Sequence, residues 1–296
     1  MTAIPEPVKR IVRQEAGFGC CKCGHPIIEY HHIVKGSQNP EDIMLLCPND
    51  HQEATVGAML EKEQRFYKSQ PYNIQKGFVE GQLKVNQISP VVNIGNNQII
   101  GTGDLLLVDG EILLSLEINE GRLELSMKLY DQQDRQIAEI KKNEWISGNP
   151  LPWDLESSFQ WIRIRRKLRD IELEVDARVD PINVRANIWR NQHNFELSPK
   201  AILFDGARIH VGFENTCFVA LRLEANTAEG TFTISPDRRF GSGAIISKFN
   251  KNERIRKGLE QWCELSSGHK FENIIDKRKY TVMKCSKCGK ITKKWK

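Results

Sequence analysis

Metal-binding side chains are concentrated near the start of the chain. Four cysteines and four histidines lie between Cys20 and His51, in the stretch CCKCGHPIIEYHHIVKGSQNPEDIMLLCPNDH. Cys20 and Cys23 form a C-x2-C turn, which aims two thiolates at one tetrahedral ion, and zinc is the natural ion for such ligands. A second half-site begins at Cys47 and ends at Asp50 or His51. The spacing therefore predicts a zinc site.

Two adjacent histidines, His31 and His32, lie inside this stretch but outside the cysteine pattern. The segment 30–33 has the composition of a strand, on which neighbouring side chains point to opposite faces. The two imidazoles can therefore have different tasks, one binding a metal ion and the other accepting the proton of a water molecule. His51 either joins them outside the zinc site or competes for the zinc.

The stretch resembles the HNH nuclease family, whose fold is a ββα-metal finger. The resemblance covers about residues 5–70 and includes the segment EDIMLLC, which aligns with the family's ENL-x-x-LC. It implies that His31 and His51 bind a catalytic divalent ion and that His32 is the general base. The structural zinc ligands that it implies are Cys20, Cys23 and Cys47.

Two positions depart from the commonest family pattern. Asp42 occupies the place of the asparagine that orients the general base, and its carboxylate can accept the same hydrogen bond from an imidazole N–H. Asp50 occupies the fourth zinc position, where a carboxylate is a rarer ligand than Cys or His. Cys21 and His25 are alternatives for that position. A purely structural finger, with zinc and no catalytic ion, is the competing interpretation.

The resemblance implies hydrolysis of phosphodiester bonds. His32 would deprotonate a water for in-line attack, while the ion held by His31 and His51 would stabilise the charge developing on the phosphoryl oxygens. An ion with so few protein ligands keeps water and phosphate around it, which suits Mg²⁺ and also Mn²⁺ or Ni²⁺. The expected substrate is DNA, with RNA as an open alternative. A finger fused to a separate β unit resembles, by architecture, bacterial restriction or phage-defence effectors.

A second metal pattern lies near the C-terminus and consists of Cys263, His269, Cys285 and Cys288. It resembles a short zinc ribbon, which at fewer than about forty residues needs its metal to fold. The alternative is a lone C-x2-C pair with an unrelated Cys263. The segment 251–296 carries 14 Lys or Arg against 5 Asp or Glu, a formal charge of +9, whereas residues 1–250 carry −4. Such a basic segment is suited to phosphate contacts.

Hydrophobic spacing predicts two helices around the first metal pattern. Residues 5–16 have helical spacing, and their basic side chains Lys9, Arg10 and Arg13 face either solvent or a DNA backbone. The run 51–68 is predicted to be the helix of the finger, weakened by a glycine in its middle.

From about residue 90 to 247, apolar residues alternate with polar ones and turn signals recur at short intervals. This pattern predicts an all-β domain, with a sandwich as the first choice and a β-solenoid as the second. Arg163, Arg165 and Lys167 share one predicted strand face, which is either solvated or follows a phosphate backbone. The predicted α+β multidomain chain has a metal finger over 1–75, a linker over 76–89, the all-β domain over 90–247 and a zinc ribbon over 248–296.

Composition bounds the compartment and the partners. The chain has no run of about 18 apolar residues and no signal-peptide core, so we expect a cytoplasmic protein with no membrane partner. In that compartment the eight cysteines favour zinc binding over disulfides. One finger provides one active site, so duplex cleavage would favour a homodimer. An activating ligand or partner could bind the β domain, although the sequence identifies neither its chemistry nor the dimer interface.

Overall fold

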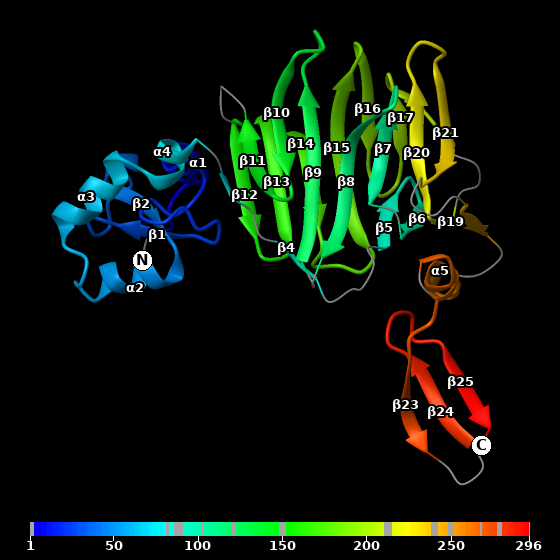
Figure 1. Ribbon diagram of the computed structural model, residues 1–296. Coiled ribbons are helices and arrows are strands. Elements are labelled where there is room, and N and C mark those ends of the chain that lie inside the picture. The colour runs from blue at the N-terminus through cyan, green and yellow to red at the C-terminus, as the bar shows by residue number, and fades with distance from the viewer. Residues whose placement is uncertain are drawn as a thin grey trace.

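The computed structural model of the chain is mixed α+β, with mostly β strands and few helices (Figure 1). The predicted α+β class is confirmed at this level. The structure describes residues 3–77, 79–80, 83–85, 91–101, 103–119, 122–147, 152–209, 215–237, 242–247, 251–266, 268–276 and 280–295. Within these residues, every helix is too short or too polar to cross a lipid bilayer.

The N-terminal part is built around a short hairpin. Its elements are α1 (Glu6–Glu15), β1 (Glu29–His32), η1 (Pro40–Asp42), β2 (Ile43–Leu46), α2 (Pro48–Thr55), α3 (Glu61–Ser69) and α4 (Tyr72–Lys76). β1 and β2 pair antiparallel, so that His31 lies opposite Met44 and His32 opposite Ile43. Every residue of β2 is buried, in a small core shared with Val12 of α1. The hairpin therefore holds the two histidines on a strand backed by apolar packing.

The predicted helix over 51–68 is wrong as a single element. α2 begins at Pro48, whose fixed φ suits a first helical turn. Gly57 follows α2 with a φ of 80°, a left-handed conformation that glycine adopts readily and that ends helices. α3 then starts with the Glu63 carboxylate accepting a hydrogen bond from the Leu60 N–H. The break allows α3 to pack against β2.

Two large sheets follow. The strands of the first are β3 (Val79–Glu80), β4 (Leu83–Lys84), β7 (Asp104–Val108), β8 (Glu111–Asn119), β9 (Arg122–Tyr130), β10 (Gln136–Lys141), β11 (Glu144–Ser147), β20 (Leu221–Asn226) and β21 (Thr231–Pro236). Their order is β21-β20-β7-β8-β9-β10-β11-β3, with β4 paired to β9.

The strands of the second sheet are β5 (Val91–Ile94), β6 (Asn97–Ile100), β12 (Asp154–Ser158), β13 (Trp161–Lys167), β14 (Asp170–Asp176), β15 (Ile182–Arg190), β16 (His193–Leu197), β17 (Ile202–Phe204), β18 (Ala207–Arg208), β19 (Cys217–Val219) and β22 (Ala244–Ile246). Their order is β12-β13-β14-β15-β5-β6-β19-β22, and β16 to β18 continue from β15 as a branch.

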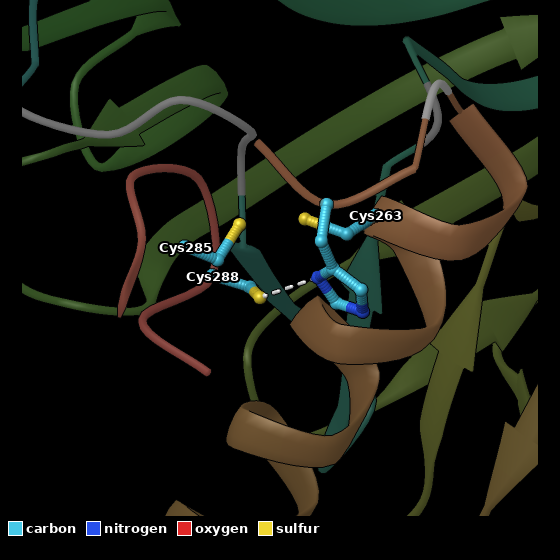
Figure 2. A group of neighbouring side chains, drawn as sticks. Cys263, Cys285 and Cys288 are labelled. Carbon is cyan, nitrogen blue, oxygen red and sulfur yellow. Dashed lines mark hydrogen bonds between the residues drawn. The ribbon is translucent and has the colours of Figure 1, made fainter. Parts of the chain in front are cut away.

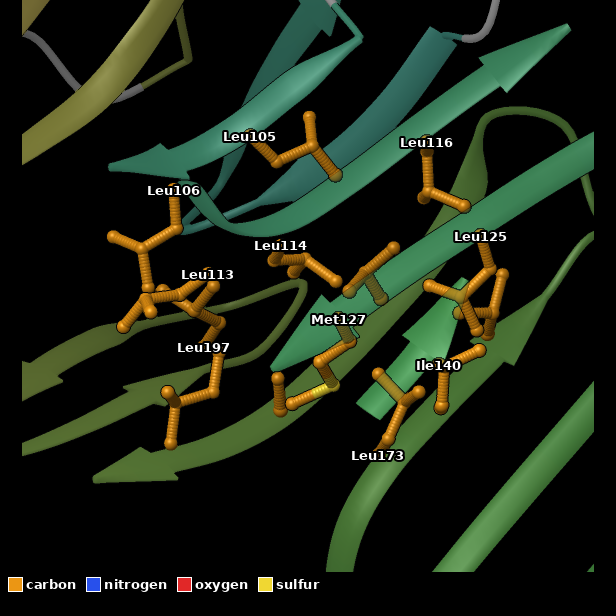
Figure 3. Packing of buried hydrophobic residues seen from close by; sticks show 14 of the residues in the cluster. Leu105, Leu106, Leu113, Leu114, Leu116, Leu125, Met127, Ile140, Leu173 and Leu197 are labelled. Atoms are coloured by element: carbon orange, nitrogen blue, oxygen red, sulfur yellow. The ribbon is translucent and has the colours of Figure 1, made fainter. Parts of the chain in front are cut away.

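One apolar core joins the two large sheets (Figure 3). Leu116, Leu125 and Met127 of the first sheet and Leu173 and Leu197 of the second are all buried in it. Because successive side chains of a strand point to opposite faces, alternate apolar residues line the inner face of each sheet. The alternation seen in the sequence is thus what builds this core.

The predicted linker over 76–89 contributes to the sheets. β3 pairs with β11, and β4 pairs with β9. Val79 and Leu83 are buried in the core of the large sheets. Strands of two residues are too short to show an alternating pattern of apolar and polar residues. The sequence of this segment therefore gave no sign of β3 and β4. Residues 78, 81–82 and 86–89 lie outside the described part of the chain.

The C-terminal part consists of α5 (Lys251–Ser266), β23 (Phe271–Asp276), β24 (Tyr280–Cys285) and β25 (Ile291–Trp295). The three strands form an antiparallel sheet. α5 packs against β6, β19 and β22 over a small core that includes Ile100 and Val219. Gly258 permits this approach, because a Cβ at that position would lie 2.7 Å from the Cys217 sulfur. The helix therefore ties the tail to the second large sheet.

The N-terminal part is docked on β12, the edge strand of the second sheet. Arg13 donates from Nε and Nη2 to the two carboxylate oxygens of Asp154, at 2.8 Å each, and from Nη1 to the Tyr30 hydroxyl at 2.6 Å. Both Arg13 and Asp154 are buried. The Arg10 guanidinium lies 4.2 Å from the centroid of the Trp153 ring. Arg13 is therefore buried in an ion pair and Arg10 is half-buried against Trp153, so that both hold α1 against the sheet.

Candidate functional site

The cysteines of the N-terminal stretch converge with a carboxylate. Ligand atoms of Cys20, Cys23, Cys47 and Asp50 all lie within 4.8 Å of one another. The sulfurs of Cys20 and Cys47 are each 3.1 Å from Oδ2 of Asp50, and the sulfurs of Cys23 and Cys47 are 3.8 Å apart. A tetrahedral zinc with Zn–S bonds of about 2.3 Å has sulfur–sulfur edges of about 3.8 Å. The donor set and its spacing therefore fit a zinc ion.

Helix geometry explains how Asp50 joins the group. Cys47 is the N-cap of α2 and Asp50 lies in the first turn of that helix. Side chains three residues apart on a helix lie on the same face, so residue 50 lies beside residue 47. The two proposed substitutes are placed elsewhere in the described chain: Cys21 is buried outside the group, and His25 Nδ1 accepts a hydrogen bond from the Ile27 N–H.

The electrostatics of the group favour an ionised carboxylate. Burial by itself would raise the pKa of Asp50, but hydrogen bonds from Lys22 and from the thiols of Cys20 and Cys47 lower it to about 2. Lys22 Nζ lies 2.9 Å from Oδ1 of Asp50, so that Oδ2 is left to face the sulfurs. An ionised carboxylate is the form that binds a metal, and a bound dication would in turn favour the thiolate forms of the cysteines.

Three histidines border one cavity in the same part of the molecule. His31 and His32 of β1 and His51 of α2 all line a cavity of about 730 Å³. The rings of His31 and His51 meet edge to face, with their centroids 5.2 Å apart. Adjacent strand residues normally point to opposite faces, so His31 and His32 would not be expected to line one cavity. His32 is the last residue of β1, and the cavity continues beyond it along residues 33 and 35–36, so His32 borders the cavity as well. The structure thus brings the three predicted histidines to one space.

Burial lowers the pKa of His31, and the nearby His51 adds to the effect. A lowered pKa favours the neutral imidazole, which is the form that can coordinate a metal. Sequence reasoning missed Glu29, whose Oε2 lies 2.9 Å from Nδ1 of His51. A carboxylate in that position fixes the orientation of the ring and leaves its other nitrogen for a metal ion. The available signal was that Glu29 lies two residues before His31, on the same face of β1.

Asp42 is close to the hairpin, and among the described residues its carboxylate contacts Ser37 and Arg65 and not His32, the residue that it was expected to orient. Oδ2 accepts a hydrogen bond from the Ser37 hydroxyl at 2.8 Å, and Oδ1 lies 3.7 Å from Nη2 of Arg65. Its contact with the histidine strand is through the backbone, where the Asp42 carbonyl accepts from the Ile33 N–H at 2.8 Å. Asp42 therefore fixes the backbone just after His32.

The cysteine group and the histidine cavity are different kinds of site. Among the described residues, three or more ligand atoms lie within 4.8 Å of one another only in the group above and in one further group near the C-terminus. Structural zinc sites are closed by four protein ligands, whereas catalytic ions keep positions open for water and substrate. The histidine cavity has imidazoles around open space and, among the described residues, no such set of converging ligand atoms.

The C-terminal group consists of Cys263, His269, Cys285 and Cys288, whose ligand atoms also lie within 4.8 Å of one another. Figure 2 shows the side chains of Cys263, Cys285 and Cys288 pointing toward one another, with Cys263 on α5. The Cys288 sulfur is 3.3 Å from Nδ1 of His269. Cys263 therefore belongs with the C-x2-C pair. Three sulfurs and one imidazole nitrogen in this arrangement fit a structural zinc ion.

Contacts around this second group support the same interpretation. The other ring nitrogen of His269, Nε2, lies 3.5 Å from Oε1 of Glu264, which fixes the ring as carboxylates do around zinc ligands. Burial would raise the pKa of Cys285, but hydrogen bonds from the Cys288 backbone N–H and from His269 lower it to about 6. Cys285 therefore favours the thiolate, the metal-binding form, whereas burial raises the pKa of Cys263 and of Cys288, whose thiolates a bound metal would have to stabilise.

The predicted cationic face of β13 is largely neutralised. Arg163 Nε lies 3.3 Å from Oε2 of Glu156, and Arg165 donates both to Asp154, at 3.3 Å, and to Glu156. These carboxylates belong to β12, the neighbouring strand. The two arginines thus serve the packing of β12 on β13, whereas Lys167, at the end of β13, is exposed.

Comparisons of this chain with protein-family models, with curated protein sequences and with solved structures find no match. The residues and their geometry are therefore the basis for any functional assignment.

Proposed function

We propose that the protein is a metal-dependent HNH-type endonuclease that hydrolyses phosphodiester bonds in DNA. The observation that carries the proposal is the cavity on which His31, His32 and His51 converge, in the same small unit as a closed cysteine group. A closed set of ligands stabilises a fold, whereas imidazoles around an open cavity can act on a substrate. The two kinds of site together are what a zinc-stabilised catalytic finger requires.

Each histidine has a separate role in this proposal. His32 is the general base, which accepts a proton from the attacking water. His31 and His51 hold a divalent ion, Mg²⁺, Mn²⁺ or Ni²⁺, and Glu29 orients His51. The ion stabilises the negative charge that develops on the phosphoryl oxygens. Lys35, which also lines the cavity, is available to neutralise a bound phosphate.

The proposal also assigns a part to each region of the fold. We assign β1, β2 and α2 to a ββα-metal finger, with structural zinc on the N-terminal cysteine group. The two large sheets form a sandwich rather than a solenoid, because both contribute to one core. The tail is a zinc ribbon with one ligand supplied by α5, and its positive charge suits a nucleic-acid tether. A restriction or phage-defence role in the cytoplasm follows by analogy of architecture.

Plasmid cleavage by the purified full-length protein tests the proposal. We expect the wild type to nick or linearise plasmid DNA with added Mg²⁺, Mn²⁺ or Ni²⁺. His32→Ala should lose at least about a hundredfold in rate, the scale of general-base catalysis, and should keep its zinc. His193→Ala is the matched control, because His193 lies on β16 and pairs with Asp205. Equal cleavage by both variants would remove His32 from the mechanism.

A non-catalytic nucleic-acid-binding protein with two structural zinc ions is the second candidate. The observation that favours it is Asp42, whose carboxylate contacts Ser37 and Arg65 rather than the proposed base. This candidate predicts no cleavage of duplex DNA, single-stranded DNA or RNA by the wild type with any of the three ions. It also predicts binding that weakens steeply with salt and is unchanged in His32→Ala.

A further inference from the structure

A second concave surface lies on the central part of the chain and shares no residue with the histidine cavity. It has a volume of about 560 Å³ and is bordered by β14, β15, β16 and β17 and by the turns between them, strands that are labelled in Figure 1. Sites for small molecules typically measure about 300–1,000 Å³. We refer to this surface as the outer-face pocket.

The floor of the outer-face pocket is the side of β15 that points away from the apolar core. Asn183, Arg185 and Asn187 alternate along β15 with Val184 and Ala186, which are buried in that core. Because side chains of a strand alternate between its two faces, the three polar residues lie together on the outside. A sheet thus presents two amides and one guanidinium in a fixed spacing.

Two turns form the walls. Arg169 and Asp170 come from the connection between β13 and β14, and Lys200 comes from the connection between β16 and β17. Glu196 of β16 also borders the pocket. The lining therefore combines three cations with two carboxylates and two amides, a mixture that suits a ligand with an anionic group and several hydrogen-bonding groups.

The cations of this pocket differ from those of β13 in their pairing. Among the described residues, the side chains of Arg169 and Lys200 have no hydrogen-bond or ion-pair partner. Arg185 makes one long contact, 3.8 Å to Oε2 of Glu174, and 57% of its side chain is exposed. Arginine and lysine that are not satisfied by neighbouring carboxylates are available to bind phosphate oxygens.

The amides are partly oriented in advance. Oδ1 of Asn183 accepts a hydrogen bond from Nδ2 of Asn93 on β5, at 3.1 Å. That contact leaves the Asn183 amide N–H groups free to donate toward the pocket. An amide fixed in this way recognises a hydroxyl, carbonyl or ring nitrogen with little further ordering.

We propose that the outer-face pocket binds a small phosphate ester that also carries hydroxyl or amine groups, the chemistry shared by nucleotides and sugar phosphates. Arg169, Arg185 and Lys200 hold the phosphate. Asn183 and Glu196 contact the remaining polar groups, the amide as donor and the carboxylate as acceptor. Inorganic phosphate would contact only the three cationic side chains and should therefore bind more weakly than the ester.

Isothermal titration calorimetry on the full-length protein, without added divalent ions, tests this proposal. The probes are adenosine monophosphate, guanosine monophosphate, glucose phosphate, inorganic phosphate and adenosine. The pocket variants are Arg185→Gln and Lys200→Gln, which remove charge at exposed positions and leave the core unchanged. The matched control is Arg122→Gln, at an exposed arginine of β9 outside the pocket, and His51→Ala controls for binding at the histidine cavity.

We expect a nucleotide or glucose phosphate to bind the wild type, Arg122→Gln and His51→Ala equally. Either pocket variant should weaken that binding by about tenfold or more, the effect of losing one charge-assisted hydrogen bond. Binding by the nucleotides alone assigns a nucleotide, and binding by glucose phosphate alone assigns a sugar phosphate. The proposal is overturned if neither class binds at millimolar concentration, or if Arg185→Gln and Arg122→Gln bind the probe equally well.

Discussion

The two cysteine groups are alike in their ligand geometry and differ in what surrounds them. Each brings three sulfurs and a fourth ligand atom within 4.8 Å of one another. The N-terminal group lies in the unit that also carries the histidine cavity, whereas the C-terminal group lies between α5 and a small sheet rich in lysine. Under the proposed function, the same coordination pattern would stabilise one unit that acts on a substrate and another that only holds it. The open cavity, rather than the metal ligands, distinguishes the two.

The two groups also differ in how their units are attached to the large sheets. The N-terminal unit depends on a buried ion pair between Arg13 and Asp154, both of which are under 10% exposed. The C-terminal unit depends on apolar packing of α5, with Gly258 against Cys217 and Ile100. A polar attachment requires one specific partner geometry, whereas an apolar attachment depends on close packing.

The largest expected effect is loss of a zinc ion. Cys47→Ala and Cys285→Ala should each lose one of two bound zinc ions, because structural zinc contributes on the order of 10 kcal/mol to the folding of a small unit. Zinc content by mass spectrometry measures this loss, and Cys217→Ala, outside both groups, should retain both ions. Under the proposed function Cys47→Ala loses plasmid cleavage, whereas Cys285→Ala weakens DNA binding through the tail. A Cys47 variant that keeps two zinc ions would contradict the N-terminal assignment.

A smaller effect is expected from Asp154→Asn, which replaces the buried carboxylate partner of the Arg13 guanidinium by a neutral amide. Breaking a buried pair in this way costs about 3–5 kcal/mol. Hydrogen exchange should become faster in residues 3–77 and remain unchanged in the segment 251–295. Asp176→Asn is the control, because Asp176 pairs with the half-exposed Arg178 and a surface pair contributes about 0–1 kcal/mol. Equal protection in the two variants would show that the ion pair does not carry the attachment.

Sequence reasoning was most informative where the chemistry is local. Both cysteine groups could be selected from spacing, because a C-x2-C turn places two sulfurs together whatever the rest of the chain does. The alternation within Leu123–Leu129 likewise reports which face of a strand is buried, since the period of a strand is two. Neither inference depends on which strand pairs with which.

The contacts that could not be predicted join residues far apart in the sequence. Arg13 and Asp154 are 141 residues apart, and nothing in the helical pattern of α1 distinguishes a buried arginine from a solvated one. The contact of Glu29 with His51 depends on how α2 returns to β1. Gly57 was identified as a weak point, but only the packing of α3 on β2 makes a break preferable to one long helix.

The apolar attachment can be tested by overpacking. Gly258→Val adds a Cβ that would lie 2.7 Å from both the Cys217 sulfur and Cδ1 of Ile100, so α5 or the sheet must shift, at a cost of about 1–3 kcal/mol. Hydrogen exchange should become faster in α5 and in the strands beneath it, while the N-terminal unit is unaffected. Lys257→Val, at the adjacent position on the same helix, whose side chain is 41% exposed, should leave this protection unchanged. A wild-type exchange pattern in the glycine variant would show that the packing is looser than the distances indicate.

The smallest structural change addresses the difference between the two cysteine groups most directly. Glu29→Gln removes the charge that contacts His51 but alters no atom of either cysteine group. Loss of an outer partner of a metal-binding histidine typically costs about 10–100-fold in metal affinity or activity, so cleavage should slow by that factor or require more Mn²⁺. Zinc content should remain at the wild-type value. Glu41→Gln, an exposed carboxylate outside the lining of the histidine cavity, is the control. If both variants cleave at the wild-type rate and with the same dependence on Mn²⁺, Glu29 does not orient a metal-binding His51.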